Sequence, residues 1–102
     1  MKTIYKYSLT LTDHQLVAMP QGAQPLSIQF QRGQLCLWAL VDTNAEMKQV
    51  DFFIRGTGHE VDFKVNVPGM VSIGDPEQHF KFVGTVQAHG GALVWHVFTG
   101  RT

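Results

Sequence analysis

The chain has 102 residues, enough for one domain with one modest hydrophobic core, and we assign residues 1–102 to that domain. Eight Lys and Arg residues balance eight Asp and Glu residues, and the basic residues are spread singly along the sequence. This excludes the basic runs typical of proteins that bind polymeric nucleic acid, and no such partner is expected. A formal net charge of zero gives little repulsion between copies, so we expect a homo-oligomer.

The first half of the chain predicts four short strands. Polar and apolar residues alternate in the first and third of them, as in strands with one buried face. In the third strand, this alternation predicts that Leu26, Ile28 and Phe30 all face the core. The fourth strand is almost continuously apolar, which indicates a strand covered on both faces or one whose outer face meets a partner. The four strands are predicted at residues 3–11, 15–19, 26–31 and 34–42, and the last two form a hairpin.

The second half predicts four more strands, the last two joined by the turn His89-Gly90-Gly91. No segment shows a sustained helical period, and the strands recur at intervals of about ten residues. The fold class is therefore all-β: a compact small sandwich or barrel of about seven to eight mainly antiparallel strands. The second set of strands is predicted at residues 49–56, 61–67, 80–88 and 92–99.

The residues that usually support metal binding or catalysis form no recognisable motif. Cys36 is the only cysteine, which excludes an internal disulfide and any cysteine-based metal framework, and we expect its side chain to be buried. The five histidines lack the spacing of metal ligands, so no metal is expected. No nucleophile elbow or cofactor fingerprint is present, so we assign no catalytic residue and no cofactor and expect a protein that is not an enzyme.

The sequence also predicts the compartment. No apolar run approaches the length of a membrane-spanning helix, and the first residues lack the apolar region of a secretory signal. We therefore expect a cytoplasmic protein without a membrane partner.

The segment IRGTGHEV, residues 54–61, is the strongest candidate for a binding loop. Gly56 and Gly58 would let successive backbone N–H groups point into one concavity, where an anion could bind, with Thr57 and His59 as further donors. Phosphate loops normally lead from a strand into a helix, however, and here another strand is predicted. The alternative interpretation, a simple turn between two strands, is therefore favoured.

Aromatic residues are numerous for so short a chain. Phe52 and Phe53 are adjacent on a predicted strand and must point to opposite faces, and Trp38 and Trp95 have apolar neighbours on both sides. Either both faces are covered within the domain, or an aromatic surface contacts a ligand or another subunit. Bases stack on such side chains, and subunit interfaces are built from them.

Five blocks of sequence together resemble a family of short proteins encoded by phages and prophages, known as a domain of unknown function. The blocks are KTIYKYSL, MPQGAQPLSIQ, LCLWALVD, IRGTGHEV and FVGTVQAHGGALVWHVF. The resemblance implies a viral accessory role in the cytoplasm of a bacterial host, and it brings no catalytic residues. Small phage proteins often counter host defence, either by blocking a host protein or by sequestering a nucleotide messenger.

The favoured function is non-catalytic capture of a small anionic, nucleotide-like ligand. Backbone donors and an arginine would hold the phosphate, and an aromatic face would hold the base. One alternative is an interaction protein that inhibits a host protein through an exposed apolar patch or strand edge, and another is a structural, virion-associated domain. The candidate ligand-binding residues are Arg55, Gly56, Thr57, Gly58, His59, Trp38, His89 and Trp95.

Overall fold

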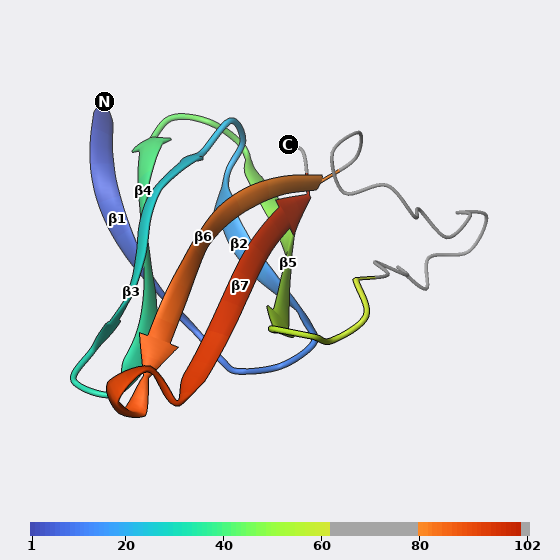
Figure 1. Ribbon diagram of the computed structural model, residues 1–102. Coiled ribbons are helices and arrows are strands. Elements are labelled where there is room, and N and C mark those ends of the chain that lie inside the picture. Colours follow the sequence, from blue (N-terminus) through green and yellow to red (C-terminus); the bar gives the residue numbers. More distant parts are fainter. Residues whose placement is uncertain (62–79, 101–102) are drawn as a thin grey trace.

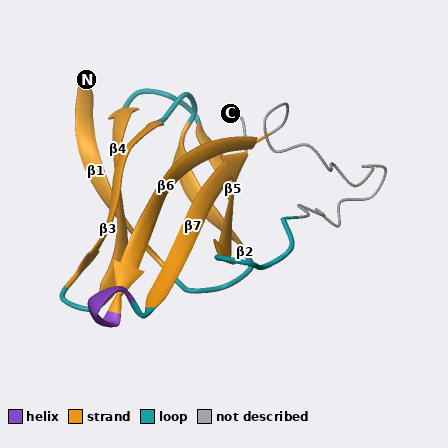
Figure 2. Cartoon of the chain, in the orientation of Figure 1, coloured by secondary structure: helices purple, strands orange, loops and turns teal. Residues whose placement is uncertain are grey.

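The computed structural model describes residues 1–61 and 80–100, and within these ranges the chain forms seven β-strands and one short 3₁₀ turn (Figures 1 and 2). The predicted all-β fold is confirmed. Another strand is predicted at residues 61–67, and all of it except residue 61 lies outside the described residues. The strands are β1 (Lys2–Leu9), β2 (His14–Pro20), β3 (Gln24–Gln31), β4 (Gln34–Asp42), β5 (Met47–Gly56), β6 (Phe80–Ala88) and β7 (Leu93–Gly100), and the turn is η1 (His89–Gly91).

The strands form two antiparallel sheets that pack face to face as a sandwich. One sheet has the order β1-β4-β3, and the other has the order β2-β5-β7-β6. Both predicted hairpins are confirmed: β3 pairs with β4, and β6 pairs with β7 through η1. Figure 1 shows the connections 21–23 and 43–46 at one end of the sandwich, here called the upper end, and η1 with the segment 57–61 at the opposite, lower end.

The core lies between the two sheets and follows the alternation along the strands. Leu37 and Ala39 of β4 face Phe52 of β5 and Val97 of β7 in this core, and all four side chains are fully buried. Phe53 points to the other side of its sheet, where it is also fully buried and meets Phe80 edge to face at 5.0 Å between ring centroids. Both faces of β5 are therefore covered, which accounts for the adjacent phenylalanines.

Two details of the predicted strands are wrong. The first strand was expected to reach residue 11 but ends at Leu9, and Leu11 is half-exposed beyond it. Leu26 was expected in the core, yet the residue is 53% exposed. The register between β3 and β4 shifts between Pro25 and Ser27, and this irregularity places one extra residue in β3 and breaks the alternation at Leu26. Cys36 is buried, as predicted.

The two sheets come close together where β3 lies against β6. A Cβ atom added at Gly84 of β6 would lie 2.6 Å from Cγ2 of Ile28, which is closer than real carbon atoms approach. The absence of a side chain at Gly84 therefore allows the approach of the sheets along this seam.

Candidate functional site

The segment that follows β5 at the lower end is a closed turn. The N–H of His59 donates to the carbonyl oxygen of Gly56 at 3.0 Å, which closes a four-residue β-turn. Gly58 occupies the third position of this turn with a φ of +88°, a conformation that glycine adopts without steric cost. The two glycines thus have the geometry expected for the turn interpretation.

The side chain of His59 folds back over this turn. Its Nδ1 accepts a hydrogen bond from the N–H of Gly56 at 3.2 Å. A Cβ atom at position 56 would lie only 2.8 Å from Cε1 of His59, so glycine makes room for the imidazole ring. Two backbone N–H groups that an anion cradle would use, those of Gly56 and His59, are therefore engaged within the turn itself.

Arg55 joins β5 to the loop that precedes β2. Its Nη1 donates to the carbonyl oxygens of Asp13 at 2.6 Å and Ile54 at 3.0 Å, and the guanidinium lies 5.8 Å from the centroid of the Phe53 ring. A polar depression of about 340 Å³ beside it is lined by Asp13, Arg55, His59 and Glu60. Because two carboxylates share this space, its charge does not favour an anion.

His96 lies at the centre of a polar network that its place in the sequence does not predict. Nε2 of His96 lies 2.7 Å from Oγ1 of Thr57, and Nδ1 lies 2.9 Å from Oγ1 of Thr85. Either tautomer of the ring can serve both hydroxyls, because each hydroxyl can donate or accept. The register places Thr85 directly opposite His96, but Thr57 comes from a different strand end, and sequence spacing cannot predict that approach.

The other predicted site residues lie in three different places. Trp95 pairs with Gly56 across β5 and β7, and its ring is 6.5 Å from that of His59, so it belongs to the lower-end group. Its indole N–H is buried without a hydrogen-bond partner in the described part of the chain. Trp38 lies on β4 in the other sheet, and His89 is exposed in the β6–β7 turn. The structure therefore brings Arg55 through His59 together with Trp95 but leaves Trp38 and His89 apart.

The upper end contains a larger cavity, which sequence reasoning missed. Its volume is about 670 Å³, within the range of small-molecule sites. Most of its walls are apolar, and they come from β2, β3, β5, β6 and β7 and from the connection before β3. The lining residues are Met19, Gly22, Ala23, Gln24, Pro25, Val50, Phe52, Phe80, Lys81, Phe82, Thr99 and Gly100.

Lys81 supplies the cationic group of this cavity. It is opposite Thr99, which is in turn opposite Phe52, so its side chain leaves the same sheet face as the core phenylalanine. Lys81 itself is exposed, because β6 is the last strand of its sheet and Lys81 lies at the rim of the cavity. The hydroxyl of Thr99 donates to the carbonyl oxygen of Asp51 at 2.9 Å and serves the sheet. The sequence motif Phe80-Lys81-Phe82 is the feature that could have pointed to this site, because its alternation places a lysine on the inward face of a strand.

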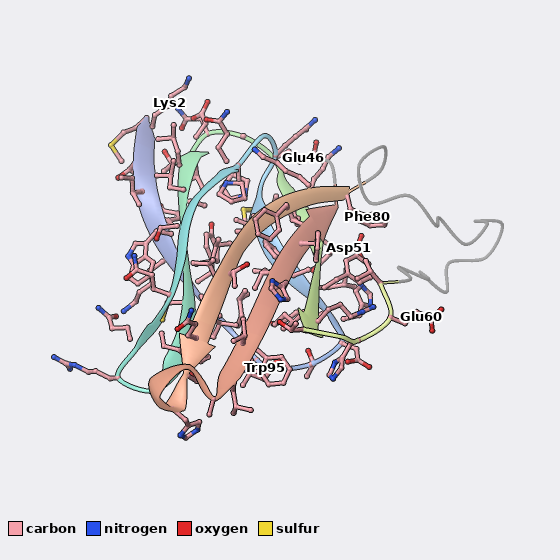
Figure 3. The ribbon with its side chains drawn as sticks, viewed as in Figure 1. Lys2, Glu46, Asp51, Glu60, Phe80 and Trp95 are labelled. Atoms are coloured by element: carbon pink, nitrogen blue, oxygen red, sulfur yellow. The ribbon has the colours of Figure 1, made fainter. Side chains whose placement is uncertain are left out.

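Figure 3 shows the separation of the two regions: Phe80 lies beside the start of β6 at the upper end, whereas Trp95 lies near the start of β7 at the lower end. Within residues 1–61 and 80–100, no group of three or more His, Cys, Asp and Glu side chains is placed to hold a metal ion. The same part of the chain contains no helix with the length and apolar character needed to cross a membrane.

Comparison with protein families gives one match, which covers residues 1–102 and is described as Domain of unknown function (DUF7352). The chain belongs to this family. The resemblance to a family of unknown function is thereby confirmed at that level. No curated protein and no solved structure matches the chain significantly.

Proposed function

We propose that the protein is a non-catalytic binding module that captures a small nucleotide-like anion in its upper-end cavity. The observation that carries the proposal is the cavity itself: about 670 Å³, lined mainly by apolar and aromatic side chains, with one ammonium group at the rim. Phe82 also borders the cavity and is 54% exposed, and its ring lies on the outer face of edge strand β6, 5.5 Å from the ring of Phe98. A base that extends over the rim of the cavity can stack on this ring. Lys81 offers a charge for a phosphate.

This proposal keeps the ligand class expected from the sequence but moves its site. Arg55, Gly56 and His59 already use donors within the protein at the lower end, so a ligand there would have to compete for them. At the upper end, a ligand that enters the cavity removes apolar surface from water, which is favourable. A phage-encoded accessory role, in which such capture counters host defence in the bacterial cytoplasm, forms part of the same proposal.

Isothermal titration calorimetry with AMP and with adenosine tests the proposal. Lys81→Ala is expected to weaken AMP binding about two- to fivefold, the range for a solvent-exposed ion pair, and to leave adenosine binding unchanged. Phe82→Ala is expected to weaken both ligands by at least about fivefold, because stacking contributes to both.

Two variants serve as controls. Leu16→Ala removes a side chain of similar exposure, 57%, from β2 outside the cavity, and it should leave both affinities unchanged. Arg55→Ala should also leave them unchanged. If Arg55→Ala abolishes AMP binding while Lys81→Ala does not, the site is at the lower end. If neither AMP nor adenosine binds, and native mass spectrometry of the protein from bacterial cells shows no bound small molecule, inhibition of a host protein becomes the better explanation.

A further inference from the structure

The two sheets have four outer strands, and three of them contain features that hinder pairing with another chain. β3 contains Pro25 and an irregular register beside it, and β6 has a register shift between Phe82 and Gly84. These two strands also lie against one another. β2 ends in Pro20, which has no N–H to donate. Prolines and bulges at sheet edges are the usual means by which proteins prevent edge-to-edge association.

β1 contains none of these features. It pairs with β4 in an unbroken register of eight residues, from Lys2 opposite Asp42 to Leu9 opposite Leu35. The strand includes no proline, and its second edge has no partner strand among residues 1–61 and 80–100. Among the described residues, an extended row of backbone donors and acceptors along β1 is therefore left without a strand partner.

The lysine in the middle of β1 does not shield this edge. Lysine side chains that project from an edge strand often prevent association. The ammonium group of Lys6, however, donates to Oε1 of Gln31 at 3.0 Å, and Gln31 lies on β3, beyond β4 and away from the free edge. Two residues near Lys6 are exposed and wholly or partly apolar. The exposed fraction is 56% for Ile4 and 44% for Tyr5.

We propose that this edge binds a second copy of the chain, with the two β1 strands antiparallel and related by a two-fold axis through Tyr5. The three strands of each copy would then form one continuous sheet. Residues opposite one another in such a pair must project from the same face of the sheet. The axis therefore passes where a residue lies opposite its own copy, and not midway between two residues of the strand. The choice among these positions depends on charge and on how many residues of β1 are paired.

Charge and overlap together favour Tyr5, because axes through Thr3 or Tyr7 also keep the lysines apart but pair fewer residues of β1 than the range 2–8 that an axis through Tyr5 pairs. An axis through Ile4 places Lys2 opposite Lys6, and an axis through Lys6 places that lysine opposite its own copy. Like charges directly opposite one another are destabilising. An axis through Tyr5 instead places Lys6 opposite Ile4, whose methyl groups can contact the alkyl part of the lysine. A net charge of zero adds no long-range repulsion between the copies.

The pairing of Ile4 with Lys6 of the second copy provides a charge test. Ile4→Lys places two lysines opposite one another and is expected to abolish the dimer, whereas Ile4→Glu places a carboxylate opposite Lys6 and is expected to preserve or strengthen it. Sedimentation velocity of the full chain, from low micromolar to near-millimolar concentration, measures the dimer fraction for each variant. Thermal unfolding of both variants checks that they remain folded, which is expected because Ile4 is exposed.

Leu16→Lys, on the outer strand of the other sheet, is the matched control and should leave the dimer unchanged. The proposal is overturned if the unaltered chain stays monomeric throughout, or if Ile4→Lys and Ile4→Glu dimerise equally. A cysteine at the axis gives an independent result. In a Cys36→Ser background, Tyr5→Cys should form a disulfide between copies on oxidation, whereas Thr3→Cys, opposite Tyr7 in this register, should not. The reverse result would contradict the register.

Discussion

The upper and lower ends of the sandwich hold different kinds of side chain. At the lower end, several polar groups are hydrogen-bonded within the protein: Arg55 donates to the carbonyl oxygen of Asp13, His59 accepts from the N–H of Gly56, and His96 lies between two hydroxyls. At the upper end, apolar side chains surround a cavity of about 670 Å³. A ligand at the lower end must displace existing hydrogen bonds, whereas a ligand at the upper end gains from burial. This difference is the reason for proposing the upper-end cavity, rather than the turn rich in glycine and histidine, as the ligand site.

The largest expected effect concerns Phe52, which is fully buried and forms part of both the main core and the cavity wall. Phe52→Ala is expected to lower the free energy of unfolding by about 3–5 kcal/mol, as large-to-small changes of buried aromatic residues do. Urea denaturation followed by tryptophan fluorescence measures this.

Phe82→Ala is the matched comparison, because Phe82 lines the same cavity but is 54% exposed. We expect it to cost at most about 0.5 kcal/mol, the range of surface substitutions. Similar losses of unfolding free energy in the two variants would show that the rim of the cavity contributes as much to stability as its base. The contrast between the two ends would then be weaker.

An effect of intermediate size is expected at the lower end. Gly58→Ala forces a residue with a Cβ atom to keep a φ of +88°, which costs about 1–2 kcal/mol. Nothing lies within 4 Å of that Cβ position, so the cost arises from the backbone alone. Thermal unfolding measures the loss, and AMP affinity should not change. If the variant keeps its fold but binds AMP more weakly, the ligand site is at this turn and not in the cavity.

The smallest expected effect is a pH dependence at the upper end, where Asp42 is the last residue of β4. The pKa of Asp42 is lowered, chiefly because its carboxylate accepts a hydrogen bond from the N–H of Asn44 at 3.0 Å. A lowered pKa in the folded state stabilises the protein above the ordinary aspartate pKa of about 4, and this contribution is lost as the pH falls through the folded-state value.

Asp42→Asn retains an oxygen acceptor without the titrating charge. Equilibrium unfolding of the two proteins should therefore differ more at neutral pH than in acid. A constant difference across this range would remove Asp42 as the source of the effect.

Local patterns predicted much of the fold. Alternation and turn residues correctly identified the hairpins β3–β4 and β6–β7, because both depend on residues near one another in the sequence. The alternation failed at Leu26, where the register shift next to Pro25 changes which face the side chain occupies. That shift depends on how β3 meets β4, and a single strand's sequence does not encode it.

The candidate site was less predictable, because its parts come from segments that are distant in the sequence. Trp38 and Trp95 both lie in largely apolar strands, yet these strands belong to different sheets, and no local pattern predicts that separation. Thr57 reaches His96 only because the turn after β5 folds beside β7. The cavity combines β2, β3, β5, β6 and β7, so it appears only when the strand order is known. Among the cavity residues, Lys81 alone could have been singled out from the local sequence, because it is a charged residue at an inward-facing position of a strand.

The close approach of Gly84 to Ile28 has a consequence for variation within the family. Since a methyl group at position 84 would meet Ile28 at 2.6 Å, related chains with a larger residue at 84 should carry a smaller one at 28. Both positions lie on strands that border the upper-end cavity. An exchange of bulk between them would change the spacing of the sheets, and hence the size of molecule admitted, while leaving every residue of the cavity wall in place. Under the proposed function, two compensating substitutions at positions 28 and 84, neither of which lines the cavity, would change the size of ligand that fits.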